Sequence, residues 1–431
     1  MPIPRDPSPD STLALLREGY SFIPERCKRL GADLFEARLM LTKALCMSGP
    51  EAAAQFYRRD RFTRRGCMPI ATLTLIQDLG SVLTLDGEDH RRRKAMFMEL
   101  MGPGRLGRIA ELTAEHWRAS VAAWERRDEV TLFHAAHVPL CGAICEWAGL
   151  TLAPDEVEQR AREFEAMVEG TGSVGPRNLR GHAMRLRNER WMRGVIGRIR
   201  SGELSVPQGS AAHVVAHHRD RNGELLPVKI AAVELINVLR PTVANARFVT
   251  YAAHALHQVP EWRERLRASD EDLEPFVQEV RRFYPFIPLI GGRVIAPFTW
   301  RDHEFCEGDW VLMDLYGTNR DARTWEDPDA FRPDRFRDRA IGAFDMIPQG
   351  GGDHAETHRC PGEWLLIEQL KVIARLLARE MTYDVPEQDL GIDLGRMPAL
   401  PDSRFVMRNV RAVARDESAD VAVSGRREPS D

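Results

Sequence analysis

No stretch of the sequence comes close to the roughly 18 uninterrupted apolar residues that a membrane-spanning helix needs. Residues 1–11 are rich in proline and aspartate, and they lack the basic stretch followed by an apolar one that marks a signal peptide. An excess of positive charge is also missing, because the net charge is −4 at pH 7, so nothing indicates nucleic acid as a partner. We therefore expect a cytoplasmic protein without a membrane anchor.

Paired cysteines are missing as well. The chain has 7 cysteines, an odd number at scattered positions, and no two of them form a CxxC pair. This pattern argues against a disulfide framework or a zinc site and favours a reducing compartment. Charged residues make up 29% of the chain and hydrophobic ones 43%, which leaves ample material for a core.

Helical periodicity dominates what the sequence does contain, and a shorter region alternates polar and apolar residues around turn signals. Glycines and a proline between residues 170 and 176 predict a loop. The patterns predict one mainly α domain, residues 1–414, with a small β region, and a polar tail at 415–431. Helical spacing is found within 12–60, 107–127, 155–170, 183–200, 228–257, 271–283 and 361–379, and strand patterns within 293–317, 381–386 and 404–413.

The segment Ile347–Glu363, IPQGGGDHAETHRCPGE, contains the most informative cysteine. Its three successive glycines let the backbone run close against something flat or bulky. Cys360 precedes a predicted helix that has Pro361 in its first turn, and backbone N–H groups at a helix start stabilise a thiolate. Taken alone, Cys360 also fits an ordinary buried cysteine in a glycine-rich turn.

Two further motifs lie upstream of Cys360. Glu279 and Arg282 stand three residues apart, so they share a helix face, and Arg335 follows in the segment PDRF. In this order, Glu-x-x-Arg, PDRF and Cys-x-Gly resemble the cytochrome P-450 superfamily. The resemblance implies a structural role for Glu279, Arg282 and Arg335. It also implies heme b, ligated by Cys360, between a long central helix and the helix of the cysteine loop.

The predicted central helix contains Arg240 and Pro241 where typical members of the superfamily carry an acid-alcohol pair. This substitution resembles the fatty-acid peroxygenase subfamily. The resemblance extends to the segments FVQEVRRFYPF, DLYGTN, FDMIPQGGGD and VGPR, which begin at Phe276, Asp314, Phe344 and Val174. It implies hydrogen peroxide and a carboxylic acid as substrates, with no redox partner required.

Physical chemistry agrees with that role for Arg240. A guanidinium stays charged and holds a carboxylate in two-point geometry, while Pro241 opens the helix locally. The held carboxylate can accept a proton from peroxide and return it to the leaving oxygen, and the oxidised carbon is then α or β to it. The alternative interpretation is a buried salt bridge between Arg240 and Glu234 or another acid.

Other site residues are implied by the same resemblance. His90 and Lys94 share a helix face and match positions that hold heme propionates, and Arg293 matches a third. The alternative interpretation of the basic residues between His90 and Lys94 is a solvated surface. Substrate-binding positions would be lined by Leu83, Gln77, Thr171, Phe286 and Leu289, although Phe286 and Leu289 also fit an ordinary core.

Leu83 cannot donate a proton, which weakens the case for decarboxylation, and Gln77 and Thr171 make the pocket polar. The hypothesis that follows is a shorter or functionalised acid as substrate. Three alternatives to hydroxylation stay open. They are decarboxylation to a terminal alkene, an oxygen- and reductase-dependent reaction with Thr242 in proton relay, and a heme-binding sensor or carrier.

Overall fold

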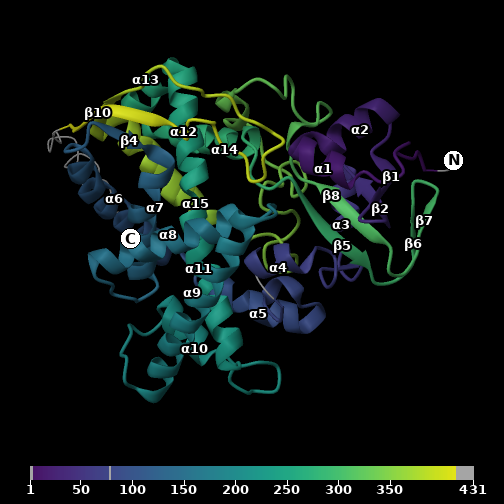
Figure 1. Cartoon of the computed structure of the whole chain (residues 1–431), viewed down its shortest axis with the longest axis horizontal. Coiled ribbons are helices and arrows are strands. Elements are labelled where there is room, and N and C mark those ends of the chain that lie inside the picture. The colour runs from purple at the N-terminus through teal and green to yellow at the C-terminus, as the bar shows by residue number, and fades with distance from the viewer. Residues whose placement is uncertain (1–2, 77–78, 414–431) are drawn as a thin grey trace, which may run out of the picture.

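The five-stranded sheet lies at the end of the molecule that carries the amino-terminus, and most helices lie on the other side (Figure 1). This computed structural model describes residues 3–76 and 79–413. The predicted tail at 415–431 falls outside the described residues. The many helices and small sheets confirm the predicted fold class, mainly α with a minor β region.

Strands of the largest sheet follow the order β1-β2-β8-β5-β3. β2 and β8 run parallel, while the other neighbours run antiparallel. Leu45 and Met47 of β2 join one core cluster, whereas Ala44 and Cys46 join another, so the sheet is covered on both faces. The strands are β1 (Leu34–Leu39), β2 (Thr42–Met47), β3 (Phe62–Thr63), β5 (Leu289–Val294) and β8 (Trp310–Asp314).

The predicted helical pattern over residues 12–60 is wrong in its middle, where β1 and β2 form a hairpin. At its turn, Met40 and Leu41 have φ angles of 50° and 61°, in the left-handed region. The leucines of this stretch imitate helical spacing, but pairing with the distant strand β8 decides the structure. Helices do flank the hairpin: α1 (Thr12–Glu18), α2 (Phe22–Leu30) and α3 (Pro50–Phe56).

The longer helices pack around α11 and α12, which run through the middle of the molecule (Figure 1). They include α6 (Pro103–Trp124), α7 (Leu132–Trp147), α8 (Pro154–Gly170), α9 (Pro176–Ser201), α11 (Val228–Ala244), α12 (Ala246–Gln258), α14 (Leu273–Phe283) and α15 (Glu363–Arg375). Shorter ones are α4 (Ile70–Ile76), α5 (Gly87–Glu99), α10 (Ala211–His217) and α13 (Pro260–Ala268). The loop predicted between residues 170 and 176 separates α8 from α9.

The small strands also match the predicted β regions. β6 (Phe298–Trp300) and β7 (His303–Phe305) form a hairpin within residues 293–317. β9 (Met381–Asp384) and β10 (Val406–Ala412) pair with each other, and β4 (Glu129–Thr131) joins them.

The predicted continuous helix over residues 228–257 is interrupted at Asn245, where α11 ends and α12 begins. Pro241 lies inside α11, one turn before this break. It has no N–H to donate to the carbonyl of Asn237, four residues earlier. The helix is therefore weakened at the point where Arg240 and Pro241 lie.

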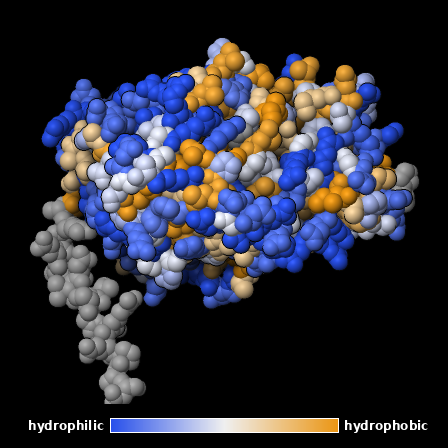
Figure 2. All heavy atoms as spheres, turned by 90° about the horizontal axis from the view of Figure 1, so that it is seen from below, coloured by the Kyte–Doolittle hydropathy of each residue, from blue (hydrophilic) through white to orange (hydrophobic). Residues whose placement is uncertain are grey.

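Hydrophilic and hydrophobic side chains are interspersed on the face shown in Figure 2. Large apolar side chains that are exposed include Leu179 and Leu186 of α9. No helix in the described part of the chain combines the length and apolar character needed to cross a bilayer.

Candidate functional site

The cysteine loop folds back on itself directly before α15. The N–H of Cys360 donates to the carbonyl of Gln349 at 2.9 Å, which closes the loop. Gly350 has a φ of +97°, and a Cβ at this position would lie only 3.1 Å from Cα of Arg359. Glycine is required there both for its conformation and for the close approach. The glycines noted in the sequence thus hold the backbone that presents Cys360.

Cys360 is half-buried and lies three residues before Glu363, where α15 begins. Burial raises the pKa of Cys360, while Lys94 and the backbone N–H of Gly362 act in the opposite direction. A thiol in this setting stays protonated until it meets a positive charge, and a coordinated metal ion deprotonates it outright. The sulfur of Cys360 is a soft donor and is therefore suited to ligate iron.

Glu363, the first residue of α15, ties the loop to its surroundings. Arg359 donates to its two carboxylate oxygens at 2.7 and 3.0 Å, and Nε2 of His354 lies 3.0 Å from one of them. Arg281 of α14 donates to the same carboxylate. Although burial raises the pKa of Glu363, these three partners hold it well below its usual range. The loop is therefore clamped to two helices by a buried charge network.

The structure brings Glu279, Arg282 and Arg335 together. Nε and one terminal nitrogen of Arg282 each donate to Glu279 at 2.7 Å, and Nε of Arg335 lies 3.4 Å from the same carboxylate. The N–H of Arg332 also donates to Glu279 at 2.7 Å. Glu279 and Arg282 are fully buried, so this network fixes α14 against the irregular chain before the cysteine loop.

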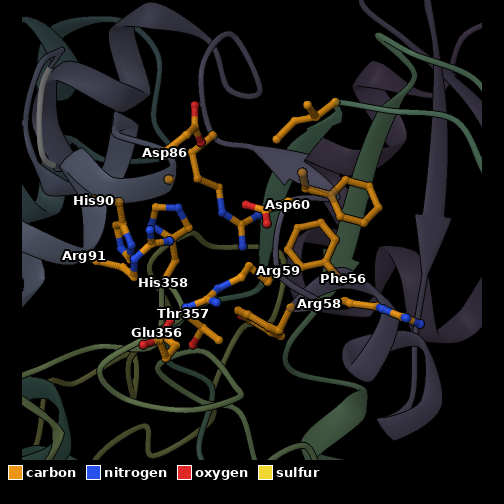
Figure 3. Close-up of a pocket in the computed structure, with 15 residues that line it drawn as sticks. Phe56, Arg58, Arg59, Asp60, Asp86, His90, Arg91, Glu356, Thr357 and His358 are labelled. Carbon is orange, nitrogen blue, oxygen red and sulfur yellow. Dashed lines mark ion pairs between the residues drawn. The ribbon is translucent and has the colours of Figure 1, made fainter.

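Basic side chains converge on the cysteine loop from a second direction. His90 of α5 lies with its ring centre 4.1 Å from that of His358, a loop residue, and Figure 3 shows the two rings side by side. Lys94 of α5 donates to the backbone carbonyls of Thr357, at 3.1 Å, and of Arg359. Arg64 lines the same pocket and donates to the carbonyl of Gly291 at 2.6 Å. We call His90, Lys94, His358 and Arg64 the basic seat.

No described carboxylate forms a hydrogen bond with any member of the basic seat. Burial, with repulsion from Lys94 and Arg64, lowers the pKa of His90 to about 4, and burial, with repulsion from Arg359, lowers the pKa of Lys94 to about 8. Burial also lowers the pKa of Arg64 and brings that of His358 well below its usual range. Nε2 of His90 is buried and has no partner among residues 3–76 and 79–413. Two buried cations, Lys94 and Arg64, beside neutral imidazoles that can donate N–H groups fit an anionic ligand.

Heme b meets these requirements. Its two propionates would balance the basic seat, and its iron would meet the sulfur of Cys360. The residues present therefore fit this cofactor, because its propionates would neutralise buried cations that form no hydrogen bond with a described carboxylate. The pocket beside the seat is open to ligand (Figure 3), and its lining includes Tyr57, Arg58, Arg59, Arg64, Asp86, His90, Arg91, Thr357 and His358.

Arg293 does not join the basic seat in this structure. Its guanidinium donates to the carbonyls of Gly66 and Gly308, both at 3.1 Å, and lies over the ring of Trp310. Arg64 occupies the pocket instead, and the sequence analysis missed it. Nothing in the local pattern separates Arg64 from its exposed neighbour Arg65, because only the sheet pairing of the preceding strand turns one of them inward.

Arg240 is buried on α11 and lacks an acidic partner among the described residues. One terminal nitrogen donates to the carbonyl of Ile76, and Nε has no hydrogen-bond partner in the described chain. Burial, with a contribution from Arg185, lowers the pKa of Arg240 to about 9. The guanidinium is still protonated at neutral pH. Arg240 therefore carries a buried positive charge, and its Nε edge is available to a ligand.

The alternative partner for Arg240 is engaged elsewhere. Glu234 accepts hydrogen bonds from Arg93 at 2.6 Å, from the N–H of Val82 at 2.9 Å and from Asn237 at 3.1 Å. The predicted alternative of an Arg240–Glu234 salt bridge is therefore wrong. Thr242, the residue considered for proton relay, donates its hydroxyl to the carbonyl of Val238 within α11.

The predicted substrate contacts are dispersed. Leu83 lies in a short 3₁₀ turn, Val82–Thr84, and Thr171 follows α8, with its hydroxyl bonded to the carbonyl of Met167 at 3.2 Å. The ring centres of Phe286 and Phe248 lie 4.4 Å apart, and Phe286 packs against the helical core, whereas Leu289 is the first residue of β5 and packs against the core on one face of the sheet. Gln77 lies outside the described residues.

Comparisons with known proteins point in the same direction. The Cytochrome P-450 family model matches residues 268–400, which include the Glu279 network and Cys360. Putative cytochrome P-450 137 of Mycobacterium tuberculosis is 22% identical over 399 residues, 87% of this chain and 83% of that protein. Cytochrome P-450 71A8 of Mentha piperita is 23% identical over 155 residues, 33% of this chain and only 30% of that protein.

Solved structures are more similar. Cytochrome P-450SP alpha (CYP152B1) in complex with (R)-ibuprofen is 48% identical, with a TM-score of 0.92 over 94% of this chain and 99% of that one. A variant of cytochrome P-450 OleT with arachidonic acid is 34% identical, with a TM-score of 0.93 over 96% and 100%. Cytochrome P-450EX alpha (CYP152N1) with myristic acid is 40% identical, with a TM-score of 0.91 over the same shares.

Proposed function

This chain belongs to the cytochrome P-450 family, in its fatty-acid peroxygenase branch, and we propose that it uses hydrogen peroxide to hydroxylate a fatty acid or related carboxylic acid at the α or β carbon. Similarity to P-450SP alpha, at 48% identity over 94% of the chain, supports this proposal. Three solved relatives hold a carboxylic acid, namely ibuprofen, arachidonic acid or myristic acid, which supports the substrate class.

In this proposal the chain is a heme-thiolate oxidoreductase whose catalytic domain spans residues 1–414. Cys360 ligates the iron, and His90, Lys94 and Arg64 hold the propionates. When bound, heme supplies an iron whose thiolate ligand favours cleavage of the O–O bond of peroxide and oxidation of a nearby C–H bond. Arg293 would contribute only after leaving the carbonyls that it contacts here.

The observation that carries the proposal is the burial of Arg240 without an acidic partner among residues 3–76 and 79–413. A substrate carboxylate would fill it, because the unused edge of the guanidinium offers parallel donors to two oxygens. The bound carboxylate then accepts the proton of hydrogen peroxide at one oxygen and returns it to the leaving oxygen. The substrate thus supplies the acid-base group, and Arg240 orients it next to Pro241, where the helix is weakened.

The clamp also explains the expected regiochemistry. A carboxylate fixed close to the reaction centre leaves its α and β carbons as the nearest C–H groups. Decarboxylation to an alkene is the less favoured outcome, since Leu83 has no group that could donate a proton during that reaction. Gln77 and Thr171 support a shorter or functionalised acid, and Phe286 and Leu289 would also line the pocket.

Peroxide use has a direct test. The purified holoprotein is given hydrogen peroxide and saturated acids of graded chain length, without a reductase, and products are identified by mass spectrometry. We expect hydroxy acids with peroxide alone and their loss when catalase is present. Products that form only with a reductase, nicotinamide cofactor and oxygen would contradict the peroxygenase assignment and restore the oxygen-dependent alternative. No turnover in either format, together with no spectral response to any acid, would favour a sensor or carrier.

A further inference from the structure

Glu234 is a buried carboxylate of α11 that connects elements on both sides of the proposed site. Its side chain is fully buried. Oε1 accepts the N–H of Val82 at 2.9 Å and the guanidinium of Arg93 at 2.6 Å, while Oε2 accepts the amide of Asn237 at 3.1 Å. A fully desolvated carboxylate with three donors holds all three in a fixed geometry, because release of any one of them leaves a buried charge less well solvated.

Two of the contacts of α11 hold the same short segment of chain. Arg240 donates to the carbonyl of Ile76 at one end of this segment, and Glu234 accepts the N–H of Val82 at the other. Six residues separate the two side chains along α11, a rise of about 9 Å. The helix that carries the carboxylate clamp thus also fixes the backbone immediately before Leu83.

Close backbone packing makes this fixation tight. Gly80 has a φ of +77°, and a Cβ there would lie 3.0 Å from Cδ1 of Ile230. Ile230 and Glu234 are one turn apart, so they present one face of α11 to this segment. The backbone is therefore pressed against Ile230 at Gly80 and hydrogen-bonded to Glu234 two residues later.

The Arg93 contact extends the same connection to the cofactor side. Arg93 lies on α5 between His90 and Lys94, two members of the basic seat, and is itself buried. Its bond to Glu234 therefore sets the distance between α5 and α11. An ion pair would require only Arg93. Glu234 also accepts a hydrogen bond from the backbone of Val82, which indicates a role beyond charge pairing.

We propose that Glu234 is a positioning residue that fixes the Val82–Leu83 backbone relative to Arg240 on the same helix, and thereby decides which carbon of the acid is oxidised. This inference rests on the proposed peroxygenase function. Glu234 touches neither cofactor nor substrate in this account. It acts through Leu83, whose apolar side chain limits where the substrate carbons next to the carboxylate can lie.

The test compares substitutions at Glu234 that differ in what they keep. Glu234→Gln retains an acceptor oxygen for Val82 and Arg93, whereas Glu234→Met has a similar length but no acceptor. Glu234→Asp retains the charge but is shorter by one carbon, and it serves if the methionine variant does not fold. Glu163→Met is the matched control, because Glu163 is also buried and bonded to Arg160 and Asn188 but lies on α8.

Two readouts are made on each holoprotein: the ratio of α- to β-oxidised product, and the hydrogen exchange of backbone amides in residues 80–84. We expect the glutamine and control variants to keep the wild-type ratio and exchange. In the methionine variant the ratio should change by roughly tenfold, as a misplacement of under about 1 Å would cause, and exchange at Val82 should accelerate. The aspartate variant should change both in the same direction, by less.

An unchanged product ratio in a folded methionine or aspartate variant would overturn the inference. So would unchanged exchange at Val82. Failure of the proposed function looks different, because then the wild type forms no oxidised acid at all. In that case faster exchange in the methionine variant alone would uphold the positioning role while the peroxygenase assignment falls, and unchanged exchange would remove the positioning role too.

Discussion

Arg240 and Lys94 are both buried cations, but they are suited to different ligands. Arg240 offers a planar fork, which matches a carboxylate that binds and leaves with each turnover. Lys94 presents a compact point charge that donates to carbonyls of the cysteine loop and lies near Cys360. A point charge of this kind suits a permanent anion better than a substrate, so we assign Lys94 to the cofactor and Arg240 to the acid.

Replacement of Lys94 should therefore loosen the cofactor more than it alters the substrate. In Lys94→Met the loss of a buried charge-assisted contact should speed heme release by about tenfold or more. The measurement is heme transfer from the holoprotein to an excess of apomyoglobin. Arg92→Met is the control, since Arg92 lies on the same helix but is exposed. Equal release rates in the two variants would remove Lys94 from the heme site.

Asp314 makes stability depend on pH. Burial raises its pKa to about 7, although Ser48 and the N–H of Gly317 donate to it. A carboxyl whose pKa is higher when folded than when unfolded favours folding at low pH, and this contribution is lost as the pH rises through about 7. Asp314→Asn keeps an acceptor and cannot ionise. The excess of its Tm over that of the wild type should be larger near about pH 8.5 than near about pH 5, by roughly 2 °C, because the contribution of the protonated carboxyl is lost between the unfolded and the folded pKa.

Calorimetry of the wild type and Asp314→Asn at the two pH values measures this difference in Tm. A difference in Tm that is the same at both would show that the ionisation of Asp314 does not influence folding. Asp321, which raises the pKa of Asp314, lies near this carboxyl, as do the titratable groups Cys27, Cys46 and Tyr316.

Among the elements, α15 and the cysteine loop form a unit that is held by Glu363. Three partners on α14 and the loop share its carboxylate, whereas Glu368, further along α15, pairs with Lys371, and both of these side chains are only half-buried. The same helix therefore contains a buried and a partly solvated ion pair, which differ in expected strength.

Glu363→Gln should lower the free energy of unfolding by roughly 3–5 kcal/mol, because buried arginines lose their charge partner. Glu368→Gln should change it by less than about 1 kcal/mol. Chemical denaturation of both variants measures the difference. Similar losses in the two would mean that Glu363 contributes no more than a surface pair and that the loop is held by its glycine-rich backbone alone.

Elements with sustained local periodicity could be predicted from the sequence, including α8, the loop before α9, and the strands around β8. The β1–β2 hairpin could not, because its leucines imitate helical spacing and its partner β8 lies far away in the chain. Pro241 was visible as a helix disruption, yet the actual break at Asn245 comes one turn later, where packing allows α12 to continue.

At the scale of the whole molecule, the site combines two kinds of residue: those in local sequence motifs and those placed by distant partners. Cys360 and the Glu279–Arg282 pair could be predicted because each motif is local in sequence. Arg64 and Glu234 could not, since their roles arise from pairing partners more than a hundred residues away, Gly291 for one and Val82 and Arg93 for the other. Local motifs reveal the chemistry, and long-range packing decides its geometry.

The central claim is that Arg240 binds the carboxylate of the substrate, which then serves as acid and base. The most direct test is steady-state kinetics with hydrogen peroxide for the wild type, Arg240→Lys and Arg240→Met, each given a fatty acid and its methyl ester. We predict that the wild type oxidises the acid and not the ester. The methionine variant should lose about 100-fold or more in kcat/KM for the acid, with the lysine variant between the two. A methionine variant that oxidises the acid at the wild-type rate, or a wild type that accepts the ester equally well, would contradict the account.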